Sequence, residues 1–194
     1  MTRSDRPSAR GTGLTALLAR RLLPEAAPGR VDVWVQGVSV GEVELAHTLA
    51  LALRSARPEL SLLVTSSTPA GVGLLERRFR DLAPPARLQP FPLDLPVSVR
   101  RLLDSATPRL LVLMETELWP VLLRAARRRG LPVLVASGRL SERSVRRLRA
   151  ARPLFRGGLD ALSAVAARSE EDAERFAAVG VPRERVHVAG DMKF

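Results

Sequence analysis

Cysteine and tyrosine are absent from the 194-residue sequence, and Lys193 is its single lysine. The lack of cysteine excludes a disulfide scaffold, a zinc finger and thiol chemistry. No apolar run reaches the ~20 residues that a membrane-spanning helix needs. The charged start, followed by an apolar stretch that Arg20 and Arg21 interrupt, does not resemble a signal peptide. We therefore expect a cytoplasmic protein that at most touches a membrane surface.

The positive charge of the chain comes almost entirely from arginine. Thirty-one basic residues face 20 acidic ones, which gives a net charge of +11. This excess of positive charge would suit binding to nucleic acid, to an anionic lipid surface or to an anionic small substrate. The alternative is that an arginine-rich proteome produces the excess without any function. Aromatic residues make up only 4%, so platforms for stacking single-stranded bases are scarce. We therefore expect no nucleic-acid partner.

Short apolar runs alternate along the chain with longer amphipathic stretches. Most runs are apolar throughout, which is typical of strands buried on both faces of a sheet. Seven such strands separated by six helices predict an α/β fold with a Rossmann-like, doubly wound parallel sheet. The predicted strands are 31–36, 60–65, 87–91, 110–114, 132–136, 162–166 and 185–189. The predicted helices are 41–57, 69–81, 95–106, 117–129, 141–156 and 169–179.

Helix boundaries have recognisable signals. Ser141 and Ser169 are each followed by acidic residues, which predicts N-caps with favourable charges in the first turn. The arginine run 127–129 stands directly before Gly130, and we interpret it as the end of a helix with a glycine cap rather than as a ligand site.

The two ends of the chain lie outside the repeating pattern. Residues 1–29 are predicted to hold a disordered tail and a short amphipathic helix at 14–23, which either docks on the domain or lies in a membrane interface. Residues 30–194 are predicted to form one Rossmann-like domain. The chain stops directly after the last predicted strand, where such a domain usually continues, so we expect a cut at a domain boundary.

Ligands of open parallel sheets bind at the carboxyl ends of the strands, which directs attention to the loop after the first strand. Gly37 and Gly41 in this loop let the backbone approach a ligand closely, and Glu42 falls at a helix start. Beside the helix dipole, this carboxylate is expected to stay ionised and to accept a proton from a hydroxyl. Spacing alone favours the alternative, in which Glu42 only caps its helix.

The loop after the second strand offers four consecutive hydroxyls, from Thr65 to Thr68. They predict either a cradle for an anionic or sugar group or, as spacing alone favours, a well-capped helix start. After the fourth strand come Glu115 and Glu117, and two carboxylates at the edge of a buried sheet are costly unless they are paired or used on a ligand. Arg139 and Arg143 are the expected partners, in either a substrate site or a structural network.

Several kinds of site find no support in the sequence. The only histidines, His47 and His187, are far apart, so neither a two-histidine metal site nor a Ser-His-Asp triad is expected. Neither Gly-x-Gly-x-x-Gly nor a P-loop motif occurs, which excludes the dinucleotide fingerprint and P-loop nucleotide hydrolysis. We expect no bound metal ion.

Five segments occur together in the order and rough spacing of one known family. They are Ser39-Val40-Gly41-Glu42, Met114-Glu115-Thr116-Glu117-Leu118-Trp119-Pro120, Gly138-Arg139-Leu140-Ser141-Glu142-Arg143-Ser144, Ser169-Glu170-Glu171-Asp172 and Gly190-Asp191-Met192-Lys193-Phe194. From about Val31 to its last residue, the chain resembles the N-terminal half of 3-deoxy-D-manno-octulosonic acid (Kdo) transferases, the lipid A glycosyltransferases.

The resemblance implies a GT-B glycosyltransferase with two Rossmann-like domains, of which this chain is the acceptor-binding one. It implies transfer of Kdo from CMP-Kdo to a lipid A precursor, in lipopolysaccharide biosynthesis, at the cytoplasmic face of the inner membrane, with no metal or other cofactor. The general base of the family corresponds here to Glu42. The expected substrate contacts are Ser39, Gly41, Thr68, Glu115, Glu117, Arg139 and Arg143, without a choice between the two glutamates.

Some features depart from the family pattern. The donor-binding domain is absent, so we expect no turnover by this chain alone, and the usual hydrophobic anchor is reduced to residues 14–23. Val121 and Asp191 stand where asparagine is usual, which puts local acceptor contacts in question. The alternative hypothesis is a non-catalytic α/β binding module that has lost the donor domain, with a nucleic-acid binder as a distant third.

Overall fold

The computed structural model describes residues 14–26, 29–155 and 157–192. The tail predicted before residue 14 lies outside these residues, as do Lys193 and Phe194. The helices are α1 (Leu14–Leu22), α2 (Val40–Ala56), α3 (Pro69–Arg78), α4 (Pro96–Ala106), α5 (Pro120–Arg128), α6 (Glu142–Ala150) and α7 (Glu170–Ala178). The strands are β1 (Val33–Gln36), β2 (Leu62–Ser66), β3 (Arg87–Pro90), β4 (Leu110–Met114), β5 (Val133–Gly138), β6 (Leu162–Ala167) and β7 (Val186–Val188). Three short 3₁₀ helices complete the chain, η1 (Arg152–Phe155), η2 (Leu159–Ala161) and η3 (Arg183–Arg185).

All seven predicted strands are present in one sheet, in the order β3-β2-β1-β4-β5-β6-β7. Every neighbouring pair is parallel, which confirms the predicted doubly wound sheet. Val33 of β1 pairs with Leu62 of β2 on one side and with Leu110 of β4 on the other. The strand order therefore reverses between β1 and β4, and this is the topological switch point where ligands of such sheets bind.

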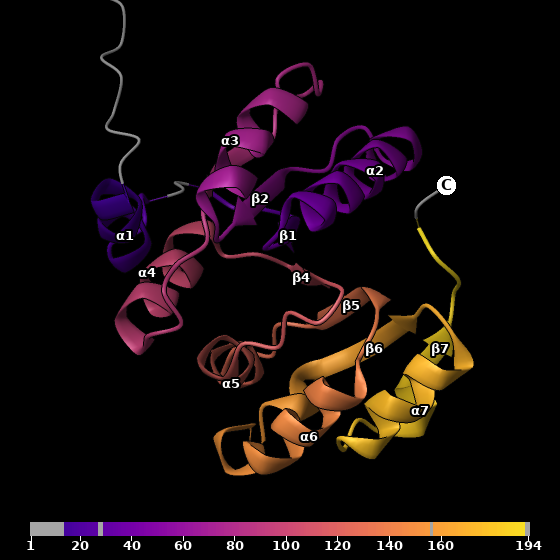
Figure 1. Cartoon of the computed structure of the whole chain (residues 1–194). Helices are drawn as coiled ribbons and strands as arrows, with labels where there is room; N and C mark the ends of the chain where they lie inside the picture. The colour runs from indigo at the N-terminus through magenta and orange to yellow at the C-terminus, as the bar shows by residue number, and fades with distance from the viewer. Residues whose placement is uncertain (1–13, 27–28, 156, 193–194) are drawn as a thin grey trace, which may run out of the picture.

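Helices cover both faces of the sheet, and each face has its own apolar core (Figure 1). On one face, α2 and α3 pack through residues such as Ala46 and Leu75 against Val35 and Val64 of the sheet. On the other face, residues of α4, α5 and α7, such as Leu102, Leu122 and Phe176, pack against the opposite side chains of the same strands. Burial on both faces is the reason that the strands are apolar throughout.

The predicted helix signals hold in the structure. The hydroxyls of Ser141 and Ser169 accept hydrogen bonds from the backbone N–H groups of Ser144 and Asp172, both at 3.1 Å. Gly130 follows the arginine run at the end of α5 with φ +61, which is the left-handed conformation expected of a glycine cap.

Three helices are clearly shorter than predicted, and one of them, α3, ends at Arg78 rather than at residue 81. Helix α5 begins at Pro120 rather than at residue 117, because Glu115 adopts a left-handed φ of +52 and the chain turns before the proline, which needs no N–H partner at the first helical position. Helix α6 ends at Ala150 rather than at residue 156. Pro153, which lacks an N–H group, instead lies in the 3₁₀ helix η1.

Helix α1 docks on the domain, which is one of the two alternatives predicted for residues 14–23. Leu17 is buried, Arg21 Nε donates to the Phe91 carbonyl at 3.0 Å, and the Ser98 hydroxyl of α4 donates to the Leu22 carbonyl at 2.7 Å. The opposite side of α1 leaves leucines such as Leu14 exposed. None of the helices among the described residues is long and apolar enough to cross a membrane.

Candidate functional site

The switch point brings together three of the predicted acidic residues. Glu42 stands in the first turn of α2, directly after β1, and Glu115 and Glu117 follow β4, the strand that pairs with β1. The charges of Glu115 and Glu42 each act on the pKa of Glu117, and the charge of Glu115 acts on that of Glu42. The loops after β1 and β4 therefore form one carboxylate cluster, consisting of Glu42, Glu115 and Glu117.

The carboxylate of Glu42 is part of the cap of its own helix. Its Oε2 accepts a hydrogen bond from the Val38 N–H at 2.9 Å, and its Oε1 accepts one from the Ser39 hydroxyl at 3.0 Å. The Ser39 oxygen in turn accepts from the Glu42 N–H at 3.2 Å. This reciprocal arrangement resembles a capping box, except that the backbone donor is Val38, the residue before the N-cap, so the capping alternative for Glu42 is present in the structure.

Burial sets the protonation of Glu42. The residue is only 7% exposed, and this loss of water raises the pKa of its carboxyl, while the hydrogen bonds from Val38 and Ser39 lower the pKa in part. The expectation that the helix start alone keeps Glu42 ionised thus omitted the larger effect, which is desolvation. A raised pKa brings a carboxylate closer to the working pH, and this improves its efficiency as a general base.

The two glycines of this loop have different roles. A Cβ on Gly37 would lie 3.1 Å from backbone and side-chain atoms of Glu42, so Gly37 permits the close packing of the loop on α2. A Cβ on Gly41 would meet nothing nearer than Ser39 Oγ, at 3.9 Å, and Gly41 is exposed. Packing inside the domain therefore does not require glycine at position 41. The space beside Gly41 leaves the start of α2 open to a ligand.

The hydroxyls after β2 are mostly used inside the domain. Thr65 Oγ1 accepts from the indole N–H of Trp34 at 2.8 Å, and the hydroxyls of Ser66 and Thr68 both donate to the Val38 carbonyl at 2.9 Å. Thr68 also caps α3 by accepting from the Gly71 N–H at 3.1 Å. Of the four hydroxyls, Ser67 Oγ alone is buried without a hydrogen-bond partner among the described residues. The geometry thus favours the capped helix start over a cradle.

Glu115 and Arg139 form the predicted ion pair between the loops after β4 and β5. The Glu115 Oε2 and Arg139 Nε atoms are 2.9 Å apart, with Glu115 buried and Arg139 half exposed. A second bond links the same loops, because the Thr116 hydroxyl donates to the Arg139 carbonyl at 2.6 Å. The left-handed backbone of Glu115 places its side chain within reach of this partner.

Glu117 has no ion pair among the described residues, and its surroundings favour the neutral acid. Burial raises the pKa of Glu117 to about 8, the charges of Glu42 and Glu115 act in the same direction, and the indole of Trp119 offsets part of the effect. Glu117 therefore carries a proton at neutral pH. The two glutamates of this loop, which the sequence left equivalent, thus differ in their surroundings, because Glu115 pairs with Arg139 and Glu117 has no ion pair among the described residues.

Two predictions about the remaining site residues have clear outcomes. The predicted pairing of Arg143 with Glu115 or Glu117 is wrong, because the exposed Arg143 side chain contacts neither residue in the described part of the chain. His47 packs edge-on against Phe79, and His187 is exposed on β7. Among residues 14–26, 29–155 and 157–192, no group of three His, Asp or Glu side chains is arranged to hold a metal ion.

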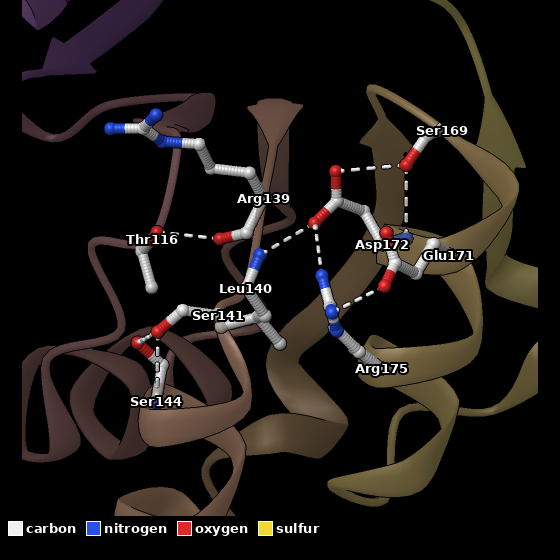
Figure 2. Close-up of polar contacts among 9 residues, drawn as sticks. All are labelled: Thr116, Arg139, Leu140, Ser141, Ser144, Ser169, Glu171, Asp172 and Arg175. Carbon is white, nitrogen blue, oxygen red and sulfur yellow. Dashed lines mark hydrogen bonds and ion pairs between the residues drawn. The ribbon is translucent and has the colours of Figure 1, made fainter.

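A polar pocket of about 430 Å³ lies beside Arg139 at the carboxyl ends of β5 and β6 (Figure 2). Its walls are Thr116, Arg139, Leu140, Ser141, Ser144, Arg168, Asp172 and Arg175. Asp172 anchors it by accepting from the Leu140 N–H at 2.8 Å and from the Ser169 hydroxyl at 3.1 Å. Arg168 is held 3.0 Å from Asp191, one of the two positions that depart from the family pattern.

The sequence reasoning missed the carboxylate that caps α5. Asp94, in the loop after β3, accepts hydrogen bonds from the N–H groups of Val121 and Leu122 at 2.9 and 2.8 Å. It fixes the start of the helix that follows Glu115 and Glu117. Asp94 lies 27 and 28 residues from these two partners in sequence, so no local sequence pattern predicts the contact. The isolated acid in Phe91-Pro92-Leu93-Asp94-Leu95, directly after a strand, was the available signal.

The chain matches the family model described as 3-deoxy-D-manno-octulosonic-acid transferase (kdotransferase) over residues 13–194. It is 32% identical over 169 residues to the 3-deoxy-D-manno-octulosonic acid transferase of Haemophilus influenzae, which covers 87% of this chain and 39% of the relative. The identity to the enzyme of the same name from Bordetella pertussis is 37% over 178 residues, or 91% of this chain and 40% of the relative. The chain thus spans about two fifths of the length of these relatives.

Among solved structures, UDP-GlcNAc 2-epimerase from Neisseria meningitidis bound to UDP-GlcNAc is similar in fold. The TM-score is 0.60 at 12% sequence identity, and the match covers 84% of this chain and 47% of that one. At this identity the likeness concerns the fold alone.

Proposed function

The chain belongs to the 3-deoxy-D-manno-octulosonic-acid transferase family, and we propose that it is the acceptor-side domain of an enzyme that transfers Kdo from CMP-Kdo to a lipid A precursor. The proposal includes a donor-binding domain in the part of the family's length that this chain does not span. It also includes peripheral attachment at the cytoplasmic face of the inner membrane and a transfer that needs no metal ion. On its own, the chain is expected to bind the acceptor without turning it over.

One observation carries the proposal: a carboxylate with a raised pKa at the switch point, beside a glycine whose Cβ position is open. A sugar hydroxyl is a poor nucleophile until a base takes its proton. Glu42 supplies the base, and the open side of Gly41 provides room for the sugar carrying that hydroxyl. As the acceptor oxygen bonds to the anomeric carbon of Kdo, its proton passes to Glu42 and the bond from that carbon to the CMP phosphate breaks.

The proposal requires a small rearrangement at Glu42. In the described state, Oε1 accepts from the Ser39 hydroxyl and Oε2 accepts from the Val38 N–H. Rotation of the Ser39 side chain releases Oε1, while the backbone bond to Oε2 keeps the carboxylate in place. The acceptor hydroxyl then takes the place of the serine hydroxyl as the donor to Oε1. Ser39 is therefore proposed as a positioning residue, which holds the base until the acceptor arrives.

The other two carboxyl groups receive different proposed roles. Glu115, held by Arg139, orients the loop after β4 and leaves part of the Arg139 guanidinium exposed for an anionic group of the acceptor. Glu117, which carries its proton at neutral pH, donates a hydrogen bond instead of adding a third negative charge beside Glu42. A neutral neighbour matters, because another buried charge would make ionisation of the base harder.

Acceptor contacts farther from the base are proposed on both sides of the cluster. Thr68 has its hydroxyl and its oxygen engaged in hydrogen bonds within the domain, so its proposed role is to hold the loop after β1 through the Val38 carbonyl. Arg143 stands exposed at the start of α6, where a phosphate of the acceptor can pair with it. Exposed leucines of α1, Leu14 and Leu18 among them, suit the acyl chains of a lipid.

A second candidate function rests on the same capping arrangement. Both oxygens of Glu42 already have donors within the domain, as they would in a binding module without catalysis. In that case, the acceptor-binding surface would persist and the carboxylate of Glu42 would serve only the helix. The two hypotheses agree on ligand binding and differ on the contribution of Glu42 to rate.

The experiment joins this chain to the donor domain of the Bordetella pertussis relative and measures Kdo transfer from CMP-Kdo to a lipid A precursor. Glu42→Gln keeps the shape of the side chain and removes its basicity, so the rate is expected to fall by ~10²–10⁴-fold. Glu142→Gln, on an exposed glutamate of α6, is the matched control and should leave the rate unchanged. A Glu42→Gln rate within a few-fold of the parent would favour the binding module.

A further inference from the structure

The net charge of the chain is concentrated in one part of the sequence. Residues 118–159 contain eleven arginines and a single acid, Glu142, which gives this segment a net charge of +10. The rest of the chain contributes only +1 of the total of +11. A proteome-wide preference for arginine would spread the excess along the whole chain, so the clustering calls for a structural explanation.

Helix α6 displays the centre of this charge on its solvent side. At 100° per residue, Arg143, Arg146 and Arg147 fall within an arc of about 100°, and all three are exposed. The opposite side of the helix carries Val145 and Leu148, which pack against the core. No residue of α6 is buried, so the helix lies on the surface of the domain with one charged side outward.

Elsewhere in this segment Arg127, Arg129 and Arg139 pair with acidic residues, but the charges on the outer side of α6 are hardly neutralised within the described part of the domain. Arg143 and Arg147 make no ion pair with the described residues, and Arg146 lies 3.6 Å from Glu142 in a pair that is more than 70% exposed on both sides. An exposed pair of this kind contributes little to stability. These three arginines of α6 are therefore not explained by folding, and their charge is available to a partner.

The neighbouring surface extends the charge and adds an apolar side chain. Arg149 and Arg152 follow on the same stretch of chain, both exposed and without an acidic partner among the described residues. Leu154 in η1 is 60% exposed beside them. Arg124 of α5 donates to the Leu154 carbonyl and so joins α5 to this surface. We call the set Arg143, Arg146, Arg147, Arg149 and Arg152, with Leu154, the arginine face.

We propose that the arginine face docks the domain on an anionic lipid bilayer, with the guanidinium groups on lipid phosphates and Leu154 entering the headgroup region. A convex helix with a one-sided row of arginines matches a flat anionic surface. An exposed leucine suits a lipid better than a nucleic acid, and no aromatic side chain is exposed on this surface for stacking on bases. The inference rests on the proposed membrane attachment and names the surface that carries it.

Helix α1 is a competing surface for the same attachment, because it exposes Leu14, Leu18, Leu22 and Leu23. Its two arginines are already engaged: Arg20 is 3.7 Å from Glu25, and Arg21 donates to the Phe91 carbonyl. Binding through α1 would be mainly apolar and would depend little on salt. Binding through the arginine face would weaken as salt screens the charges.

The test is sedimentation of the chain with phosphatidylcholine vesicles, with and without an equal share of phosphatidylglycerol, at about 0.05 M and about 0.3 M salt. The chain is expected to bind only the anionic vesicles, and less at high salt. Each arginine near the surface contributes about fivefold, so the triple variant Arg143→Gln/Arg146→Gln/Arg147→Gln should bind about a hundredfold more weakly. Thermal unfolding and circular dichroism check that each variant is folded.

A matched control makes the same change of charge on the other face of the sheet. Arg57→Gln/Arg77→Gln/Arg80→Gln removes three exposed arginines at or near the ends of α2 and α3, and it should retain most of the binding. Equal loss in both triple variants would mean that only net charge matters, and it would overturn the proposal. Equal binding to neutral vesicles would overturn it as well.

Two further arms separate this surface from its rivals. If Leu18→Asp/Leu22→Asp abolishes vesicle binding and the α6 triple variant does not, the arginine face is wrong while membrane attachment through α1 stands. If the α6 triple variant loses affinity for a duplex RNA oligonucleotide but binds vesicles like the parent, the partner is a nucleic acid and the proposal fails. Neither arm involves Kdo transfer, so its outcome is independent of the catalytic role of Glu42.

Discussion

The loops after β1 and β4 each contribute a glutamate to the carboxylate cluster, and the surroundings of the two differ, with Glu42 buried and Glu117 partly buried. Glu42 receives hydrogen bonds on both oxygens, from the Val38 N–H and the Ser39 hydroxyl. Glu117 lies in the next loop of the switch point without an ion pair among the described residues, and its pKa is raised to about 8. Burial raises the pKa of both groups, but the lowering contributions differ: Glu42 has donors from Val38 and Ser39, whereas Glu117 has only the indole of Trp119 and lies beside two other carboxylates.

The difference indicates how a domain can hold two carboxyl groups close together at neutral pH. The charged form of one group is stabilised by N–H and O–H donors of a helix start, and the other group avoids the charge by keeping its proton. A base and a proton donor then stand side by side without mutual repulsion. Enzymes assign acid and base roles by separating pKa values in this way.

Removal of the ionisable group of Glu117 should have the largest effect on the free energy of unfolding. Because its pKa is raised from the ordinary value of 4.5 to about 8, the folded state binds the proton more tightly than the unfolded chain. Its contribution to stability is complete below about pH 4.5 and is lost as the pH rises to about 8. Glu117→Gln cannot ionise, so its free energy of unfolding should exceed that of the parent by on the order of a few kcal/mol at alkaline pH.

Urea unfolding at a series of pH values measures this difference. The gap between Glu117→Gln and the parent should open between about pH 5 and pH 8 and then stay constant. Glu142→Gln, which removes one acid from the exposed surface of α6, is the matched control variant. A Glu117→Gln curve parallel to that of the parent would mean that Glu117 is ionised across this range, and the contrast with Glu42 would disappear.

Alanine at Gly71 and at Gly41 should have different effects on stability, because only Gly71 is closely packed inside the domain. A Cβ on Gly71 would clash with Ser66 Oγ and lie 2.9 Å from the Val38 carbonyl oxygen, so Gly71→Ala should cost about 1–3 kcal/mol. A Cβ on Gly41 has its nearest neighbour at 3.9 Å, and Gly41→Ala should change stability by less than about 1 kcal/mol.

Thermal unfolding compares the two glycine variants, and binding of a lipid A precursor completes the test. Gly41→Ala should keep its stability and lose affinity for the acceptor, because its methyl group fills the space proposed for the sugar. If Gly41→Ala binds as well as the parent, the open side of the α2 start is not the acceptor position. A large loss of stability in the same variant would show that packing does require this glycine.

Removal of the Ser39 hydroxyl, which donates to Glu42, should have a smaller effect on stability. Ser39→Ala removes the N-cap of α2 and a donor to Oε1, and it should cost about 1 kcal/mol. Ser141→Ala removes the cap of α6, where the cap lies at the surface, and should cost about as much. Chemical unfolding of both variants separates the cap from the carboxylate, since only Ser39→Ala should also shift the titration of Glu42.

Much of the architecture follows from the sequence, because runs such as Leu110–Met114 are apolar on both faces and leave a buried parallel strand as the simplest structure. The reversal of strand order at β1 and β4 gathers Glu42, Glu115 and Glu117 at one edge, as the strand-end rule predicts. Their charge states do not follow, because desolvation depends on atoms that the whole fold supplies.

Two errors, at Arg143 and Asp94, concern contacts between segments that are far apart in sequence. Arg143 was expected to pair with a glutamate of the neighbouring loop, but it lies on the outward side of α6, and the residue spacing from Arg139 does not fix that side without the exact start of the helix. Asp94 caps a helix that begins 26 residues later. Contacts of this kind depend on the packing of α4 and α5 rather than on any local pattern.

We propose that Glu42 can take a proton at neutral pH while Glu117 already carries one. Carbon-13 chemical shifts of the glutamate side-chain carboxyls, followed through a pH titration of the chain, test it directly. The account predicts that Glu42 titrates above the ordinary glutamate range yet is ionised at neutral pH, and that Glu117 titrates near pH 8. A charged Glu117 at neutral pH, or a protonated Glu42, would contradict it.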